Sequence, residues 1–570
     1  MWIDALAATA DIESHPNRTL SLIIAELAKS HGSFPALLSD HSNFDFATLG
    51  ERIARYARWA SENGVRRGDT VALIMRNRPE YVAIWLGIAA AGGVTALINT
   101  NLTGPPLAHC IGLAHAKHAI VEDALLQHYE EALAPHKERP ELWCYGEGVA
   151  GHRRIDTEIA IFDAGEIAIV ADVTLDDKAL LIYTSGTTGL PKAAHISHRR
   201  IMNWVLWFKG MLGTTEADRI YTCLPLYHSV GGIVAVGATL VSGGSVVIAE
   251  KFSARNFWKD ITRWDCTLFQ YIGELCRYLL NSPHDASETC HHLRMVCGNG
   301  LRRDVWEPFK TRFAIPQILE FYAATEGNFS LYNAEGKPGA IGRIPSFLRH
   351  RYGIAVVKHD ITTGTVQRGA DTFCVPVETG ETGEAIGRIG SGADTSGRFE
   401  GYTNDTDSEK KILRNVFKPG DAWFRTGDLM RVDASGYYYF VDRIGDTFRW
   451  KGENVSTLEV ESVIAACPGV VEAVVYGVAV PGADGRAGMA KLVITDHFNL
   501  SDFRSFVEAR LPAYALPQFL RIGASFDITE TFKHKKQDLM REGFDPEATT
   551  DQLYANDAVS RSYKRIGAGS

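Results

Sequence analysis

The pattern of apolar and polar positions changes along the chain. From residue 45 to about 300, segments with helical spacing of apolar residues alternate with short apolar runs. One helix face is formed by apolar residues at i, i+3, i+4 and i+7: Ile201, Trp204, Val205 and Phe208. The short runs are typical of buried strands, as at 71–74, 180–183 and 246–248. This alternation predicts parallel sheets with covering helices.

A different pattern follows residue 340. Up to about residue 440 the sequence is rich in glycine, strand-like runs and turns, which indicates a barrel or an antiparallel sheet. A further unit begins near residue 445, where Ser456 and Glu459 form a capping box ahead of an apolar helix face. Two strand-like runs and a second amphipathic helix then predict a small α+β domain. We expect the tail after residue 548 to be loosely ordered.

Two uncharged runs, 81–98 and 231–249, have to be weighed as membrane spans. In the first, Pro79 predicts a helix start and Gly92 a helix stop, which leaves about thirteen helical residues where a bilayer needs about twenty. Glycines interrupt the second run. Both are better interpreted as a buried helix followed by a strand. The N-terminus also lacks the basic and then apolar order of a signal peptide.

Chain length, net charge and cysteine spacing limit the kinds of protein that this sequence can encode. A chain of 570 residues is too long for one hydrophobic core, so two or more domains are expected. The net charge of -9 gives no general basis for nucleic-acid binding, which needs a basic face. Nine scattered cysteines without a CxxC pair indicate reduced thiols in the cytoplasm.

The strongest chemical signal is a loop after the strand that ends near Tyr183. Its polar and glycine positions are Thr184, Ser185, Gly186, Thr187, Thr188, Gly189 and Lys192. Hydroxyl groups, backbone N–H groups exposed by glycine and a lysine suit a loop that wraps nucleotide phosphates. It is not a P-loop, because GxxxxGK[ST] cannot be placed on it and an apolar strand follows instead of a helix. The alternative is a Ser/Thr/Gly surface turn.

This loop resembles the phosphate-binding loop of the adenylate-forming superfamily, which includes acyl-CoA synthetases, luciferases and the adenylation domains of peptide synthetases. Other segments resemble the family motifs in the expected order: 224–228, 298–301, 322–327, 425–429 and 442–443. The stretches 322–328, 424–429 and above all 442–456 are most similar to the very-long-chain acyl-CoA synthetases, also called fatty-acid transport proteins.

The resemblance assigns roles to single residues around the phosphates. The loop at 184–192 would hold the β- and γ-phosphates of ATP. Thr184 and Glu326 would help to hold Mg²⁺, a cation that prefers oxygen ligands. Thr325 would contact the α-phosphate, and Thr325, Glu326 and Arg443 would belong to the catalytic group. Taken singly, Glu326 could instead be a solvated carboxylate and Arg443 a surface ion-pair partner.

For the rest of the substrates, the resemblance implies an adenine pocket lined by Gly298, Asn299 and Tyr322. Asp428 would accept hydrogen bonds from the ribose hydroxyls, with Arg443 beside it. His228 would either gate the acyl site or pack against it.

The family's catalytic lysine lies near the end of the chain, usually in a Pro-Lys-Thr-x-x-Gly-Lys context. This chain departs from that pattern, since 528–536 reads Ile-Thr-Glu-Thr-Phe-Lys-His-Lys-Lys. Counting from Thr529 identifies Lys533, with Phe532 at the usual glycine position. Lys535 and Lys536 stay open as alternatives.

The hinge between the domains also departs from the family. The usual Asp or Lys two positions after Arg443 is Gly445 here, followed by Asp446. Glycine tolerates the torsion changes that a hinge needs. After rotation, the resemblance implies a CoA-facing loop made of Arg449, Trp450, Lys451 and Gly452.

We therefore expect an α/β fold in two domains. Residues 1–443 would form the adenylate-forming domain, with two α/β subdomains and a β-rich subdomain. Residues 444–570 would form a small, mobile α+β domain that acts as a lid, with the hinge near Gly445.

The expected reaction converts ATP, a long- or very-long-chain fatty acid and CoA into acyl-CoA, AMP and pyrophosphate through an acyl-adenylate, with Mg²⁺. Two alternatives stay open: a CoA ligase for a bile-acid-like, aromatic or carnitine-type acid, and a membrane-associated fatty-acid uptake protein. We expect a cytoplasmic protein that binds no nucleic acid, and peripheral contact with the inner face of the membrane stays open. Oligomeric state is not readable from the sequence.

Overall fold

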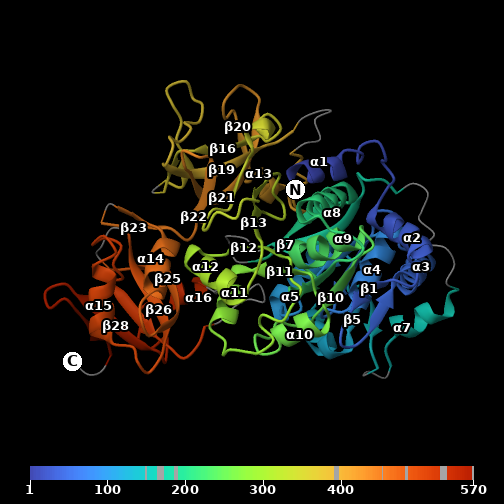
Figure 1. The fold of residues 1–570 in the computed structure, drawn as a ribbon, viewed down its shortest axis with the longest axis horizontal. Coiled ribbons are helices and arrows are strands. Elements are labelled where there is room, and N and C mark those ends of the chain that lie inside the picture. The colour runs from blue at the N-terminus through green and yellow to red at the C-terminus, as the bar shows by residue number, and fades with distance from the viewer. Residues whose placement is uncertain are drawn as a thin grey trace.

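The computed structural model describes residues 1–147, 151–163, 173–184, 190–361, 363–390, 397–451, 453–481, 485–526 and 536–567. Along these residues, no helix combines the length and the apolar character needed to cross a bilayer. The expected α/β class, with a large N-terminal part and a smaller C-terminal part, is confirmed (Figure 1).

The first sheet has the strand order β6-β5-β3-β4-β7-β8, parallel except for the β7–β8 hairpin. Its strands are β3 (Thr70–Ile74), β4 (Val94–Leu97), β5 (His118–Glu122), β6 (Glu141–Tyr145), β7 (Lys178–Thr184) and β8 (Lys192–Ser197). The helices of this part of the chain are α3 (Phe46–Glu62), α4 (Pro79–Ala90), α5 (Gly104–Ala114), α6 (Leu126–Leu133) and α7 (Ile155–Glu158). Every residue of α4 is buried, which accounts for its uncharged sequence.

The second sheet has the order β14-β13-β12-β11-β9-β10-β1-β2, parallel except at its two edges. Its strands are β1 (Pro35–Leu38), β2 (Asn43–Asp45), β9 (Arg219–Thr222), β10 (Ser245–Ile248), β11 (Leu268–Ile272), β12 (Met295–Asn299), β13 (Ile318–Ala323) and β14 (Ser330–Asn333). The accompanying helices are α1 (Trp2–Thr9), α2 (Leu20–Ser30), α8 (His198–Leu212), α9 (Ala235–Leu240), α10 (Phe257–Arg263), α11 (Gly273–Leu280) and α12 (Arg303–Arg312). One apolar core joins the two sheets, since Trp85, Ile182 and Ile220 belong to the same buried cluster.

The glycine-rich region forms an antiparallel sheet, one of the two expected forms. Its order is β15-β22-β21-β19-β16, with β20 also paired to β21. The strands are β15 (Gly342–Arg343), β16 (Ile354–Val357), β19 (Thr382–Arg388), β20 (Ile412–Arg414), β21 (Ala422–Val432) and β22 (Tyr437–Arg443). A small hairpin, β17 (His359–Asp360) and β18 (Thr365–Val366), and helix α13 (Asp405–Glu409) accompany it.

The C-terminal unit has a core of its own, which runs from Phe448 to Tyr563. Its sheet, β25-β26-β27-β28-β29, comprises β25 (Val470–Ala479), β26 (Arg486–Ile494), β27 (Phe519–Ile522), β28 (Gln552–Asp557) and β29 (Ser562–Arg565). A hairpin of β23 (Phe448–Trp450) and β24 (Glu453–Val455) and helices α14 (Thr457–Ala465), α15 (Leu500–Glu508) and α16 (Lys536–Glu542) complete it. Ser456 caps α14 as expected, since its Oγ accepts the N–H of Glu459 at 3.3 Å.

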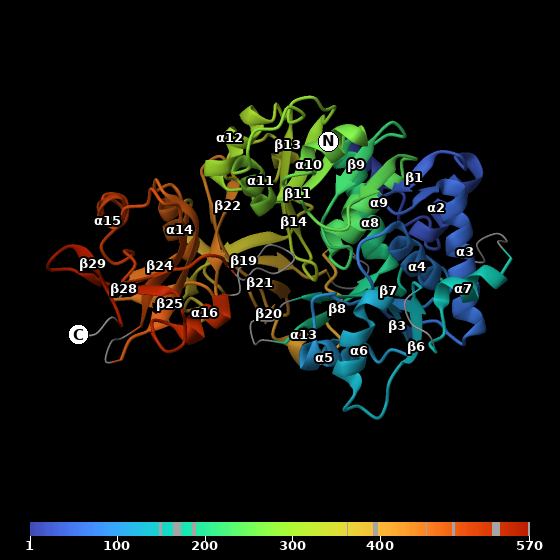
Figure 2. The same cartoon turned by 90° about the horizontal axis from the view of Figure 1, so that it is seen from below.

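The expectation of a loose tail after residue 548 is wrong. Strand β28 pairs antiparallel with both β27 and β29, so the end of the chain completes the C-terminal sheet. The C-terminal unit lies at one end of the molecule, next to α11 and α12 (Figures 1 and 2). Arg277 of α11 bridges the two parts, because its Nη2 lies 2.8 Å from Glu472 Oε1 of β25.

Candidate active site

The two ends of the candidate phosphate loop are fixed by the β7–β8 hairpin. Thr184 is the last residue of β7 and Lys192 the first of β8, and they are register partners. The Lys192 ammonium lies 2.9 Å from Asp407 Oδ1. The loop residues between these strands, Ser185, Gly186, Thr187, Thr188 and Gly189, lie outside the described residues. The hairpin thus places the predicted threonine and lysine at the same end of the first sheet.

The predicted adenine and ribose residues come together where the second and third sheets meet. Tyr322 of β13 donates its hydroxyl to Asp428 Oδ2 of β21 at 2.6 Å. Burial, and then the charge of Asp428, raises the pKa of Tyr322 well above its usual value, so this hydroxyl stays protonated. Arg443, the last residue of β22, lies opposite Asp428, with Nε 3.8 Å from Oδ1. These contacts bring the three predicted residues into one group.

The turn after β13 carries Thr325 and Glu326, and side chains from two other segments hold it. Ser229 Oγ lies 3.0 Å from Thr325 Oγ1. Tyr402 donates its hydroxyl to Glu326 Oε1 at 2.7 Å. Burial and Glu326 raise the pKa of Tyr402, while a hydrogen bond with the Thr184 side chain lowers it. The Tyr402 hydroxyl thus bonds to Glu326, and it lies close enough to Thr184, the other predicted metal residue, for Thr184 to affect its pKa.

Gly298 and Asn299 lie at the carboxyl end of β12, as the adenine assignment requires. A Cβ at Gly298 would lie 2.2 Å from the Tyr271 carbonyl oxygen, so only glycine fits there. The following loop is held by Glu320, whose Oε1 accepts the N–H of Leu301 at 3.1 Å and whose Oε2 accepts the Tyr271 hydroxyl at 2.5 Å. Burial raises the pKa of Glu320 to about 8, against the lowering effect of these hydrogen bonds.

His228, the predicted acyl-site residue, precedes an irregular helical segment. The His228 carbonyl accepts the N–H of Gly232 at 2.8 Å, at the start of the π-helix η3 (Val230–Val234). A Cβ at Gly232 would lie 1.9 Å from the Leu226 carbonyl oxygen, so the glycine permits this close packing. Single-turn π-helices occur frequently at functional sites. The uncharged run at 231–249 is thus a buried helix followed by β10, as expected.

The C-terminal candidates differ in exposure. Arg449 and Lys451 are exposed on the β23–β24 hairpin, whereas the Trp450 ring is buried in the C-terminal core. Gly445 lies in the turn after β22, where an added Cβ would meet nothing within 4 Å. Gly452 and Lys533 lie outside the described residues.

Lys536, an alternative for the catalytic lysine, is largely buried in the C-terminal unit. Its Nζ lies 3.0 Å from Glu461 Oε1 and donates to Thr457 Oγ1 at 2.9 Å. Burial lowers the pKa of Lys536, but Glu461, Asp446 and Asp442 outweigh that effect and raise it. These contacts account for the burial of the Lys536 ammonium within the C-terminal unit.

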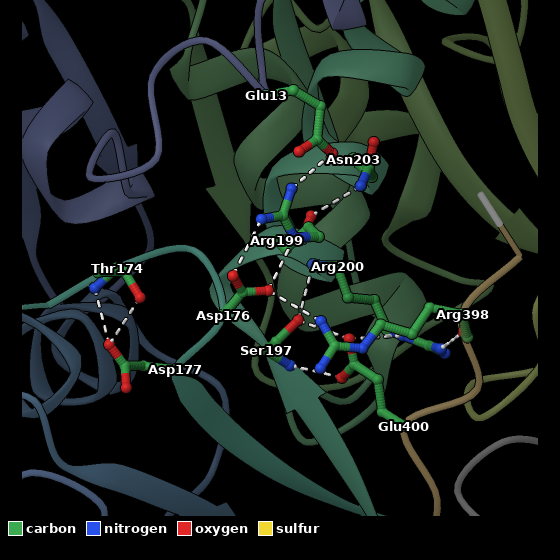
Figure 3. Close-up of polar contacts among 10 residues, drawn as sticks. All are labelled: Glu13, Thr174, Asp176, Asp177, Ser197, Arg199, Arg200, Asn203, Arg398 and Glu400. Carbon is green, nitrogen blue, oxygen red and sulfur yellow. Dashed lines mark hydrogen bonds and ion pairs between the residues drawn. The ribbon is translucent and has the colours of Figure 1, made fainter. Parts of the chain in front are cut away.

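Sequence reasoning missed Arg200, Ser229, Glu320 and Tyr402, which hold the predicted residues in place. One signal was present: His198, Arg199 and Arg200 open helix α8, where the helix dipole disfavours cations. Such an arrangement indicates carboxylate or carbonyl partners elsewhere in the fold. Arg199 has Asp176 and Arg200 has Glu400 as such partners (Figure 3). Tyr402 and Ser229 carry no comparable local signal.

The fold and the nucleotide-type site define the class of protein. The family model described as "AMP-binding enzyme" matches residues 24–368, and the model described as "AMP-binding enzyme C-terminal domain" matches residues 459–533. The chain belongs to the AMP-binding enzymes, which confirms the resemblance to the adenylate-forming superfamily.

Close relatives define the family more narrowly as that of the long-chain fatty acid transport proteins. Long-chain fatty acid transport protein 1 of mouse (Mus musculus) is 40% identical over 560 residues, which cover 96% of this chain and 85% of the relative. Long-chain fatty acid transport protein 2 of rat (Rattus norvegicus) is 38% identical over 564 residues, with 97% and 90% covered.

Solved structures share the fold at lower identity. An anthranilate CoA ligase in complex with anthranoyl-AMP has a TM-score of 0.77 at 22% identity, over 92% of this chain and 96% of that one. A fatty acyl CoA synthetase of Mycobacterium tuberculosis has a TM-score of 0.63 at 22% identity, over 92% and 98%.

Proposed function

We propose that this AMP-binding enzyme is a fatty acid–CoA ligase that activates long- or very-long-chain acids as acyl-adenylates and transfers the acyl group to CoA. The observation that carries this proposal is the convergence of Thr184, Glu326 and Tyr402 next to the Tyr322–Asp428–Arg443 group. The relatives are named for long-chain fatty acids, which supports the acyl class.

The chemistry explains why such a site is needed. In the first step a carboxylate oxygen attacks the α-phosphorus of ATP, and the bond to the β-phosphate oxygen breaks to release pyrophosphate. In the second step the CoA thiol gives up its proton to solvent and its sulfur attacks the acyl carbonyl, and AMP leaves with the electron pair of the broken acyl–oxygen bond. Preorganised donors facing the developing charge lower both barriers. We assign the stabilisation of that charge to the side chains of Thr325, Arg443 and Lys533.

Mg²⁺ fits the oxygen groups of Thr184 and Glu326, where a bound ion would neutralise phosphate charge. Asp428 would orient the ribose, and Gly298 and Asn299 would leave room for the base. The exposed cations Arg449 and Lys451 are the candidates for contact with CoA. All nine cysteines are free and all but Cys290 are buried, which supports the proposed cytoplasmic location.

The test is an AMP-release assay with and without CoA, over acids from acetate to very long chains and including a sterol acid and cinnamate. Each methylene buried in an apolar tunnel adds about 0.8 kcal/mol, so kcat/KM rises steeply with chain length. Acyl-CoA forms only in the complete mixture. Equal values of kcat/KM for acetate and palmitate would contradict the long-chain proposal, and preference for the sterol acid or cinnamate would favour the alternative ligases.

A matched variant ties the activity to the site. Glu326→Gln keeps the shape of the side chain but removes its charge, so AMP release falls by about 10²-fold or more. A protein that takes up fatty acids without ligase activity predicts no AMP release from either form.

A further inference from the structure

A guanidinium from a distant helix supports the main chain of the Thr325–Gly327 turn. Arg200 lies in the first turn of α8, and its Nη1 donates to the carbonyl oxygens of Thr325 and Gly327, both at 2.9 Å. Its Nη2 donates to the Arg398 carbonyl oxygen at 2.9 Å. One planar group thus joins the catalytic turn to a third segment of the chain.

The surroundings of Arg200 fix its side chain in this orientation. The residue is only 8% exposed. Glu400 Oε1 lies 3.7 Å from Nε, and Glu400 is itself held by the N–H and the hydroxyl of Ser197 (Figure 3). Burial lowers the pKa of Arg200, and Glu400 and Glu326 act against that effect. Because a guanidinium loses its proton only above about pH 12, Arg200 stays charged.

Tyr402 approaches the same turn from another side. Its segment pairs with β8: Gly401 accepts the N–H of His195 at 3.1 Å, and Thr403 donates to the Ala193 carbonyl at 2.9 Å. This pairing aims the Tyr402 hydroxyl at Glu326, 2.7 Å away. Tyr402 is 4% exposed, so its ring has little freedom to turn elsewhere.

We propose that Arg200 and Tyr402 are positioning residues for the first half-reaction. Arg200 fixes the main chain that carries Thr325 and Glu326, and Tyr402 orients the Glu326 carboxylate toward Mg²⁺ and the phosphates. This inference rests on the proposed function. Neither side chain acts on the reacting atoms itself.

The physical reason is that transition-state stabilisation depends on fixed distances. A displacement of about 1 Å can cost about 10²-fold in rate. Lysine cannot replace Arg200, because an ammonium is a point charge, whereas the planar guanidinium serves three carbonyl oxygens and a carboxylate in set directions.

The first experiment compares Arg200→Lys with Arg199→Lys. Arg199 lies on the same helix turn, but its partners are Asp176 and Glu13, which lie outside the catalytic turn (Figure 3). For Arg200→Lys, kcat of pyrophosphate release falls by about 10²-fold, while the Kd for ATP changes by less than about threefold. For Arg199→Lys, kcat stays within about twofold. Equal kcat values for the two variants, at any melting temperature, would overturn the role of Arg200.

The second experiment removes one hydroxyl. Tyr402→Phe keeps the ring and removes the hydroxyl, and with it the hydrogen bond to Glu326. Loss of a group that orients a metal ligand lowers metal affinity about tenfold. Calorimetry measures the Kd for ATP with and without Mg²⁺. We expect the factor by which Mg²⁺ lowers this Kd to be about tenfold smaller in Tyr402→Phe than in the wild type. The control is Tyr439→Phe, whose hydroxyl donates to Asp433 at the opposite end of the β21–β22 hairpin from Asp428 and Arg443.

An unchanged effect of Mg²⁺ on ATP affinity in Tyr402→Phe would overturn the role of Tyr402. This binding measurement separates the inference from the proposed function. Wild-type protein that binds ATP with Mg²⁺ but releases no pyrophosphate with any acid would refute the ligase proposal alone.

Discussion

The buried ammonium of Lys536 is compensated by neighbouring carboxylates, so its presence does not require a catalytic role. Glu461 is 5% exposed and Asp442 is 1% exposed, so removal of the ammonium leaves buried carboxylates without their cation. Breaking a buried ion pair costs about 3–5 kcal/mol. For Lys533, by contrast, we propose that the ammonium stabilises the transition state of adenylate formation.

We predict opposite phenotypes for the two lysines. Lys533→Ala lowers acyl-adenylate formation by about 10²–10³-fold and leaves the melting temperature unchanged, because its ammonium acts mainly in the transition state. Lys536→Met lowers the free energy of unfolding by about 3 kcal/mol and keeps most of the activity per folded molecule. Pyrophosphate release and thermal unfolding measure the two effects. Normal pyrophosphate release by Lys533→Ala, together with an inactive but stable Lys536→Met, would reverse the assignment.

Glu320 gives the stability of the protein a pH dependence. Its pKa is raised from 4.5 to about 8, mainly by burial. Between these values the folded chain retains a proton that the unfolded chain has lost, so the free energy of unfolding falls as pH rises through this window. One pKa unit corresponds to about 1.4 kcal/mol, so the effect amounts to a few kcal/mol.

The matched variant is Glu320→Gln, which resembles the neutral carboxyl and can still bond to Leu301 and Tyr271. We predict that thermal unfolding from pH 5 to 8 shows a smaller decline in melting temperature for the variant than for the wild type. Parallel curves for the two proteins would show that Glu320 titrates with an ordinary pKa.

At the residue scale, the sequence predicted the groups whose chemistry is shared by a family and missed those that support them. Tyr322 and Asp428 were assigned through motifs, and the structure brings them within hydrogen-bonding distance. Tyr402 could not be found in that way, because its position depends on pairing between its segment and β8, some 200 residues earlier in the chain. Long-range register leaves no local trace in a sequence.

At the scale of elements, burial decided what could be predicted. Helix α4 and the central strands are buried on all sides, so their apolar runs are continuous. Strands β28 and β29 lie at the end of a sheet and are partly exposed, with few apolar residues. Their weak pattern explains the wrong expectation of a loose tail. The capped start of α14, in contrast, depends on local chemistry and was predictable.

We propose that the turn after β22 is the hinge about which the C-terminal unit moves. It is closed by hydrogen bonds from the N–H groups of Asp446 and Thr447 to the Arg443 carbonyl, at 3.0 and 3.1 Å. Proline at Gly445 would fix φ near −65° and restrict Ile444. Alanine would add only a Cβ, for which the structure has room.

At the scale of the whole molecule, a hinge at this turn predicts that a substitution can slow acyl transfer to CoA without slowing acyl-adenylate formation. We expect Gly445→Pro to form acyl-adenylate, seen as one pyrophosphate per active site, and to transfer the acyl group to CoA at least about 10²-fold more slowly. Gly445→Ala serves as the control, with both rates near those of the wild type. Normal rates of both steps in Gly445→Pro would move the hinge elsewhere, with Asp446 as the next candidate.

Contacts across the two units also resist such a movement. Arg277 Nη1 donates to the Val471 carbonyl at 3.0 Å, and its Nη2 pairs with Glu472, so α11 holds the start of β25. The Arg277 side chain is 12% exposed, and that burial makes the pair stronger than an open surface ion pair. A rotation of the C-terminal unit has to break these contacts, which therefore bias the protein toward the arrangement in Figure 1.

The place of Arg443 has a mechanical consequence. It is the last residue of β22, opposite Asp428 and directly before the turn. A rigid body that turns about a pivot displaces each atom in proportion to its distance from the pivot. If the C-terminal unit turns about this hinge, β28 and β29 would move far, whereas Arg443 and Asp428 would hardly shift. A ribose bound to this pair would stay in place while different residues of the C-terminal unit come to face it. The acyl-adenylate would therefore not have to move between two sites, because rotation would bring the residues of the second half-reaction to it.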